Sequence, residues 1–108
     1  MTDRKKALTD LLAKVEAGEW FPGLAQLSFG GVQNYSYAAE SFIGSIDAAK
    51  ALHEAVLPGF HYSIDSEGGS VCVFDHLMSN AQLGTDDDPA RAWLIAIIKA
   101  LISMEGAE

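Results

Sequence analysis

Residues 86–102, DDDPARAWLIAIIKALI, place three aspartates directly before a proline and a long apolar run. Pro89 suits the first helical position, where a missing backbone N–H costs no hydrogen bond, and Asp88 before it suits the N-cap. Asp86 and Asp87 add negative charge near the positive end of the helix dipole. The triplet therefore predicts the start of a helix, rather than a cluster that holds a metal or a basic partner.

The predicted helix is apolar around almost its whole circumference, and such helices are buried on more than one side. Its broad core-facing stripe comprises Ala90, Trp93, Leu94, Ile97, Ile98 and Leu101. A second row beside it consists of Ala92, Ile95 and Ile102. In so short a chain the helix is therefore either central or in contact with another chain. We expect a symmetric homodimer that pairs this second row; in the competing interpretation, residues 20–37 cover it within the same chain.

A β-hairpin is predicted upstream of this helix, with strands over residues 60–65 and 70–76. Apolar and polar residues alternate in the first strand, SEGG supplies the turn, and the returning strand is apolar on both sides. One face of the hairpin then holds Tyr62, Ile64, Val71 and Val73. The other face holds His61, Ser63, Cys72 and Phe74. A strand that is apolar on both sides predicts at least partial cover of both faces of the sheet.

Two further helices are predicted toward the N-terminus. The first repeats apolar residues at the spacing of one helical face, namely Leu8, Leu11, Leu12 and Val15. Thr2 or Asp3 can cap its start, and Gly18 can end it. The second helix covers about 45–57, with Ser45 as its N-cap and the sequence PG at its end.

The segment between these helices, residues 19–44, carries a weaker pattern because one proline and several glycines interrupt regular structure. We expect a short helical turn there, followed by an extended piece over 35–43. Together the elements predict a compact α/β sandwich of the α+β kind, with about three helices packed on a small antiparallel sheet. The 108 residues suit one domain, 1–108, because single cores commonly occupy chains of about 100 to 150 residues.

The chain is strongly acidic, with 7 Lys and Arg against 15 Asp and Glu and a net charge of −8. Such a surface repels phosphates, which argues against direct nucleic-acid binding. It suits a basic partner, but acidity is also a common route to solubility. A single cysteine, Cys72, excludes an internal disulfide and fits a reducing compartment. The sequence contains neither a signal-peptide pattern nor an apolar stretch long enough to cross a membrane. We expect a soluble cytoplasmic protein.

Three stretches, in order, resemble one family: LTDLLAKVEAGE (8–19), FIGSIDAAKALHEAVLPGFHYSI (42–64) and DPARAWLIAIIKALI (88–102). They are similar to small uncharacterised phage and prophage proteins described as having an α-β-α sandwich domain. Members typically show Val-Glu-Ala after a leucine-rich helix, a Ser-x-Asp-Ala-Ala helix start and a terminal helix that opens near Ala-Arg-Ala. The matching motifs here are residues 15–17, 45–49 and 90–92. The resemblance implies a fold and a phage-related origin, and lends no activity.

No catalytic, cofactor-binding or metal-binding residues are predicted. His53 falls on the polar side of the second helix, beside Lys50 and Glu54, and is interpreted as a solvated surface residue. Cys72, within a strand, is interpreted as a small buried hydrophobe rather than a nucleophile, because no sequence signature supplies it with an oriented base.

Two other sets of residues have a functional and a structural interpretation. A turn at Gly68 and Gly69 would place His61 opposite His76, yet no metal-ligand spacing accompanies this pair. The neighbouring aromatic residues of the middle segment can line a groove, but they are better explained as buried anchors of a loop; they are Trp20, Phe21, Tyr35 and Tyr37.

These observations favour a non-catalytic phage or prophage accessory protein that acts through contacts with an unidentified protein partner. The alternative is an acidic mimic of nucleic acid that occupies a host DNA-binding protein. A small-molecule-binding domain or an enzyme is the third hypothesis, and it requires a pocket with converging polar groups.

Overall fold

The computed structural model describes residues 3–30, 32–65, 69–77 and 79–105. Its helices are α1 (Asp3–Glu16), α2 (Pro22–Phe29), α3 (Val32–Phe42), α4 (Ile46–Val56) and α5 (Pro89–Glu105). Its strands are β1 (His61–Asp65), β2 (Ser70–Phe74) and β3 (Ala81–Thr85), paired antiparallel in the order β1-β2-β3. The predicted combination of helices with a small antiparallel sheet is confirmed, with five helices in place of about three.

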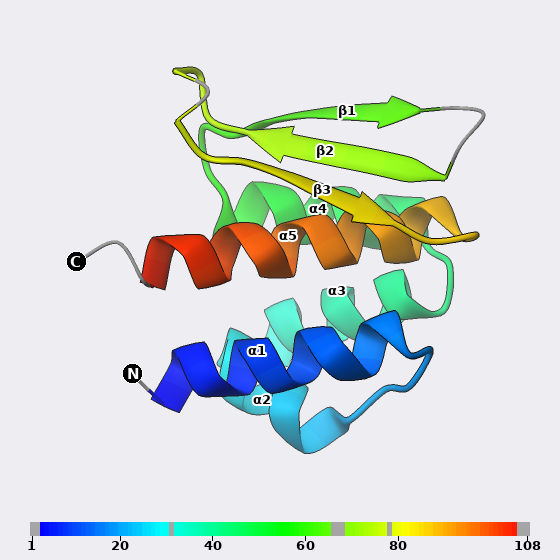
Figure 1. Cartoon of the computed structure of the whole chain (residues 1–108). Coiled ribbons are helices and arrows are strands. Elements are labelled where there is room, and N and C mark those ends of the chain that lie inside the picture. The colour runs from blue at the N-terminus through cyan, green and yellow to red at the C-terminus, as the bar shows by residue number, and fades with distance from the viewer. Residues whose placement is uncertain (1–2, 31, 66–68, 78, 106–108) are drawn as a thin grey trace.

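The elements form stacked layers, with α5 in the middle (Figure 1). The sheet is the upper layer, α5 runs beneath it with α4 behind, and α1, α2 and α3 make up the lower part. The apolar circumference of α5 is explained by this position, since the helix contacts both the sheet and the helices below. Its Trp93, Leu94 and Ile97 are fully buried.

The five helices lie on one side of the sheet, so among the described residues they cover only one of its faces (Figure 1). Val71 and Val73 of β2 point to the helices and are fully buried, whereas Cys72 and Phe74, on the other face, are only partly buried. The prediction of at least partial cover for both faces agrees with this burial, which is complete on the helix side and partial on the side that carries Cys72. One layer of helices buries alternate residues of a strand and leaves the others exposed.

The strand β3 was not predicted, and it lies directly against α5. A Cβ atom added to Gly84 would collide with the carbonyl oxygen of Ala92 and lie 2.6 Å from the backbone nitrogen of Ala96. Beside this contact, the Lys99 Nζ donates a hydrogen bond of 2.9 Å to the carbonyl oxygen of Leu83. A glycine in a strand often marks such a close approach of two backbones.

The predicted helix starts are confirmed by their capping hydrogen bonds. The Asp88 carboxylate accepts from the backbone N–H of Ala90 at 2.9 Å, and the Asp86 carboxylate accepts from the N–H of Asp88 at 2.9 Å. The Ser45 hydroxyl accepts from the N–H of Ala48 at 3.1 Å. Of the two predicted caps of α1, Thr2 lies outside the described residues, and Asp3 is the first residue of the helix.

The middle segment differs from the prediction, because residues 32–42 form the helix α3 rather than an extended piece. Ala38 and Phe42 are buried at helical spacing, and the buried Ser41 hydroxyl donates to the carbonyl oxygen of Ala90. Arg91 then donates from Nε and Nη2 to the Phe42 carbonyl oxygen and stacks 4.1 Å over the Phe42 ring. These bonds join the end of α3 to the start of α5, far away in the sequence, and α3 also packs against α4.

The hairpin has the predicted faces but a different register at its open end. Tyr62 pairs with Val73 and Ile64 pairs with Val71, as expected for residues of one face. His61, however, lies opposite Phe74 and not opposite His76. The innermost pair is Asp65 with Ser70, so the connection is two residues longer than a tight turn at 68–69, and the register shifts by two. Residues 66–68 of this connection lie outside the described part of the chain.

Candidate functional site

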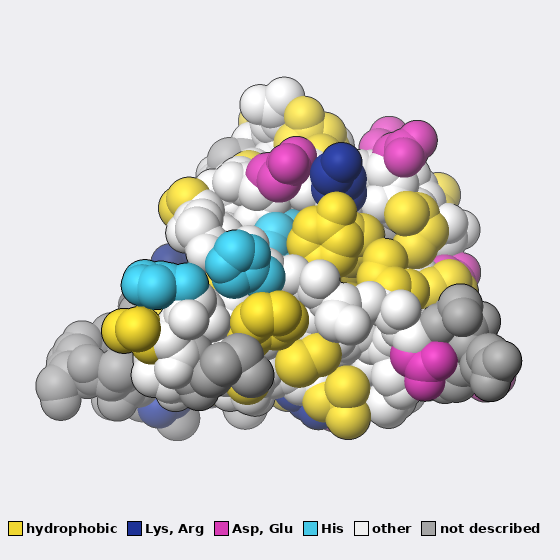
Figure 2. All heavy atoms as spheres, turned by 90° about the horizontal axis from the view of Figure 1, so that it is seen from above, with side chains coloured by type: hydrophobic (Ala, Val, Ile, Leu, Met, Phe, Trp, Pro, Cys, Tyr) yellow, Lys and Arg dark blue, Asp and Glu magenta, His cyan; other side chains and the backbone are white. Residues whose placement is uncertain are grey.

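The uncovered face of the sheet is the candidate functional surface, and we call it the outer face. The register assigns to it His61 and Ser63 from β1, Cys72 and Phe74 from β2, and Ala81 and Leu83 from β3. Seen from above, hydrophobic side chains gather over the sheet, with histidines toward one end and acidic groups near the margins (Figure 2).

The centre of the outer face is apolar and continuous across two strands. Leu83 is 52% exposed and lies directly opposite the partly buried Cys72, while Ala81 lies opposite Phe74. The His61 ring packs against the Phe74 ring with 5.6 Å between centroids. These side chains form an accessible apolar patch bordered by groups that can hydrogen-bond.

An ionised carboxylate lies at the end of β2, next to the outer face. The hydrogen bond from the Ser79 hydroxyl holds the pKa of Asp75 below its ordinary value, and the Ser79 backbone N–H, 2.8 Å from the carboxylate, acts in the same direction. Both bonds favour the charged form over the protonated one. The turn after β2 therefore presents a fixed negative charge near the apolar patch.

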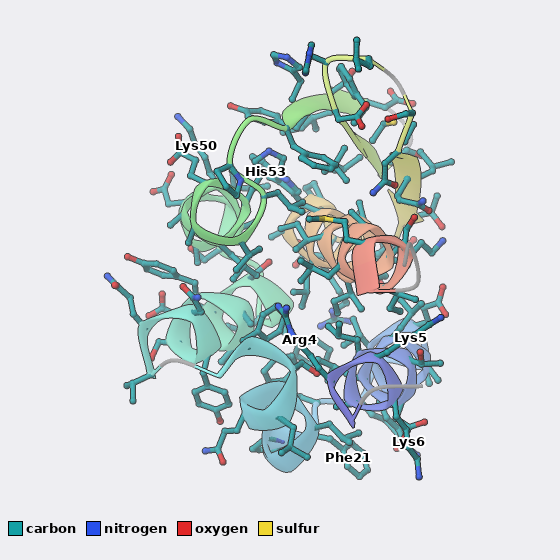
Figure 3. All side chains as sticks on the ribbon, turned by 90° about the vertical axis from the view of Figure 1, so that its left-hand side faces the viewer. Arg4, Lys5, Lys6, Phe21, Lys50 and His53 are labelled. Carbon is teal, nitrogen blue, oxygen red and sulfur yellow. The ribbon has the colours of Figure 1, made fainter. Side chains whose placement is uncertain are left out.

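His53 is the residue whose position sequence reasoning missed, because it is 2% exposed rather than solvated. The Trp93 Nε1–H donates to its Nδ1 at 3.3 Å, and its Nε2 lies 3.0 Å from the carbonyl oxygen of Phe60. A carbonyl can only accept and an indole N–H can only donate, so Nε2 is the donor to Phe60 and Nδ1 is the acceptor from Trp93. Figure 3 shows His53 and Lys50 leaving α4 on different sides.

The position of His53 on α4 explains its role, and the spacing of its apolar neighbours in the sequence would have indicated that it is buried. It follows Ala49 by four residues and Leu52 by one, and both of these are fully buried. His53 therefore sits at the margin of the apolar stripe of α4, where a satisfied ring can be buried. It joins α4 to α5 and to β1, where the Tyr62 ring packs edge-on at 5.3 Å. This buried polar group is structural.

The residues that suggested a metal or a nucleophile do not converge. Among the described residues, no three His, Cys, Asp or Glu side chains group as a metal site would require. His61 stacks on Phe74, as described above, and Cys72 lies half-buried in the outer face. Of the aromatic residues in the middle segment, Trp20 packs on Phe42 at 5.2 Å and on Tyr35 at 6.4 Å, as expected for an anchor.

Hollows elsewhere on the described surface are small and open to solvent. One of them, about 440 Å³, is lined by Arg4, Ala55, Val56, Leu101 and Met104. Two others of about 360 Å³ lie along α2, one against α3 and one against α1. Their linings mix polar or charged side chains with apolar ones, and none of the three contains a histidine or cysteine.

The predicted self-association row lies mostly inside the single chain. Ala92 is 0% exposed and Ile95 is 1% exposed, while Ile102 is partly buried against the same core. The β3 strand, at Gly84, covers α5 at Ala92. Residues enclosed in this way offer no surface to a second copy. The covering element is thus a strand that was not predicted, rather than residues 20–37.

Comparison with protein-family models, curated protein sequences and solved structures finds no match to this chain. None of the helices in the described ranges is long and apolar enough to cross a membrane.

Proposed function

We propose that this protein is a non-catalytic binding module, and that a protein partner docks on the outer face of its sheet. The observation that carries the proposal is the exposure of Leu83 beside Cys72 and Phe74, on a face that no described helix covers. Contiguous apolar surface bordered by polar groups is typical of protein interaction sites. Its aromatic residue, Phe74, is of a type that is enriched at the cores of interfaces.

The charge of the chain supports a basic partner. A net charge of −8 favours a protein whose own apolar patch is bordered by Lys and Arg. The ionised Asp75 beside the outer face supplies one specific contact for such a basic side chain. The resemblance to phage and prophage proteins supports a bacterial host protein as this partner, in an accessory role without catalysis.

The acidic-mimic hypothesis requires a particular arrangement of the acidic residues. A mimic presents carboxylates in rows that match the spacing of phosphates, and its binding is governed by charge. The densest acidic run of this sequence is 86–88, and two of its three carboxylates accept hydrogen bonds inside the start of α5. An interface centred on Leu83 instead combines apolar contact with a charged border.

Affinity capture from bacterial lysate with a matched pair of variants tests the proposal. Leu83→Gln removes the apolar centre of the outer face, and Leu27→Gln makes the same change on α2, where Leu27 is 67% exposed. We expect Leu83→Gln to lose the captured protein and Leu27→Gln to retain it, with both variants folded by circular dichroism. Equal capture by both variants contradicts the proposal. Capture that duplex DNA abolishes and that falls steeply with salt supports the mimic instead.

A further inference from the structure

The two margins of the sheet differ in how they are protected. At the β3 margin, α5 packs against Gly84, and the Lys99 ammonium group donates a hydrogen bond to the carbonyl oxygen of Leu83. The β1 margin lies at the other end of the strand order, and all five residues of β1 are exposed. Figure 1 shows β3 running along α5 and β1 at the far side of the sheet. One margin is thus covered and the other is accessible.

Edge strands are usually protected, because their unpaired N–H and C=O groups can pair with another chain. Natural proteins protect them with Lys, Pro, a bulge or a covering element. The β1 sequence HYSID contains neither Lys nor Pro, and its pairing with β2 is continuous over all five residues, without a bulge. Tyr62 and Ile64, on the helix-facing side, remain 40% exposed each, so the strand carries accessible apolar surface in addition to its edge.

The sequence of β1 is complementary to itself when two copies run antiparallel. Centring the pairing on Ser63 aligns all five residues of each strand, with Ser63 opposite its own equivalent. His61 then lies opposite Asp65 of the second copy, and Tyr62 lies opposite Ile64. Aromatic residues opposite β-branched ones are among the pairs that stabilise sheets. An imidazole N–H opposite a carboxylate can donate a hydrogen bond to it.

The backbone geometry allows this register. In an antiparallel pair, residues that exchange hydrogen bonds alternate with residues that do not. Two residues that lie opposite each other must therefore both point their backbone N–H and C=O groups toward the other strand, or both point them away from it. Pairing 61 with 65 and 62 with 64 joins residues an even number of positions apart, which meets this condition. The same parity keeps side chains of one face together, so the outer faces of the two copies become one surface.

We propose that β1 is a self-association edge, at which a second copy of this chain adds its own β1 in the antiparallel register centred on Ser63. The product is one continuous sheet in the order β3-β2-β1-β1-β2-β3, with a two-fold axis between the Ser63 residues of the two copies. His61 N–H groups contact the Asp65 carboxylates of the other copy, and a carboxylate has acceptor sites for more than one donor. Tyr62 and Ile64 gain apolar cover. This assembly does not depend on a partner at the outer face.

A charge exchange between His61 and Asp65 tests the register. His61→Glu places two carboxylates opposite each other at both symmetric contacts, and we expect it to weaken dimerisation about tenfold. The double variant His61→Glu/Asp65→Lys restores opposite charges, so dimerisation should recover. Within one chain these positions lie about 13 Å apart along the strand, so recovery reports a contact between copies. Sedimentation equilibrium from low to high micromolar concentration measures each dissociation constant.

A disulfide test uses the two-fold axis and does not rely on charge. Opposite Cα atoms of antiparallel strands lie about 4.5 or 5.5 Å apart, within the range that a disulfide spans. In a Cys72→Ser background, Ser63→Cys should oxidise rapidly to a covalent dimer. Thr85→Cys, which is exposed on the same face at the β3 margin, should do so much more slowly. A monomeric wild type at high micromolar concentration, a double variant without recovery, or equal oxidation rates would each overturn the proposal.

Discussion

Gly84→Ala should strongly destabilise the fold, although it adds only one methyl group. Gly84 lies where β3 crosses α5, and the new Cβ would collide with the Ala92 carbonyl oxygen and lie 2.6 Å from the Ala96 nitrogen. Both atoms belong to the backbone of a helix that is buried on two sides, so neither can rotate away as a side chain would. Overpacking of a core costs about 1–3 kcal/mol, and a collision with backbone falls at the upper end. We expect a loss of about 3 kcal/mol of unfolding free energy.

Gly23→Ala is the matched control, because it adds the same methyl group in open space. No other atom lies within 4 Å of the added Cβ, and Gly23 occupies the first turn of α2. Restricting the unfolded chain at such a site stabilises a protein by about 0.4–1 kcal/mol. Urea denaturation followed by circular dichroism compares both variants with wild type through their midpoints. A Gly84→Ala midpoint equal to that of wild type would refute the direct contact between β3 and α5.

Three further predictions concern polar groups of the described fold. His53→Leu leaves the Trp93 N–H and the Phe60 carbonyl oxygen without their partner, so it should cost about 2–4 kcal/mol in urea denaturation; wild-type stability would contradict the structural role. Asp88→Ala removes the α5 cap and should cost about 1 kcal/mol, while Asp87→Ala, at an exposed carboxylate, should cost less, and calcium or magnesium should leave the wild-type melting temperature unchanged. The hydrogen bond from Ser79 lowers the pKa of Asp75 from 3.8, so Ser79→Ala should reduce the unfolding free energy above pH 3.8. The difference in stability between wild type and Ser79→Ala should vanish as the pH falls through the lowered pKa. A stability difference that persists in stronger acid would contradict the bond to the carboxylate.

The outer face illustrates how far the candidate site could be predicted. Alternation along the hairpin correctly assigned Cys72 and Phe74 to one face and Val71 and Val73 to the other. Alternation does not say which face the helices cover, because both faces of β2 are apolar. The third strand was missed because AQLGT contains few residues that favour strands, and its glycine serves the contact with α5. Leu83, the most exposed apolar residue of the face, was missed with it.

The sequence by itself determined those features whose causes lie within a few residues of one another. Three such features depend on bonds and spacings between near neighbours. They are the helix caps at Asp88 and Ser45, the end of α1 near Gly18 and the two faces of the hairpin. Such local preferences are readable before any tertiary contact forms. The apolar circumference of α5 likewise determined that this helix is enclosed.

Tertiary structure alone decided what encloses α5 and which borderline residues are buried. The helix at residues 32–42 packs against α4 and, through Ser41 and Phe42, meets Ala90 and Arg91, 49 positions away. His53 entered the core because Trp93 and the Phe60 carbonyl satisfy both ring nitrogens. In each case a weak local preference was outweighed by packing and hydrogen bonds from distant segments, since the free energy of burial depends on the partner that a residue meets.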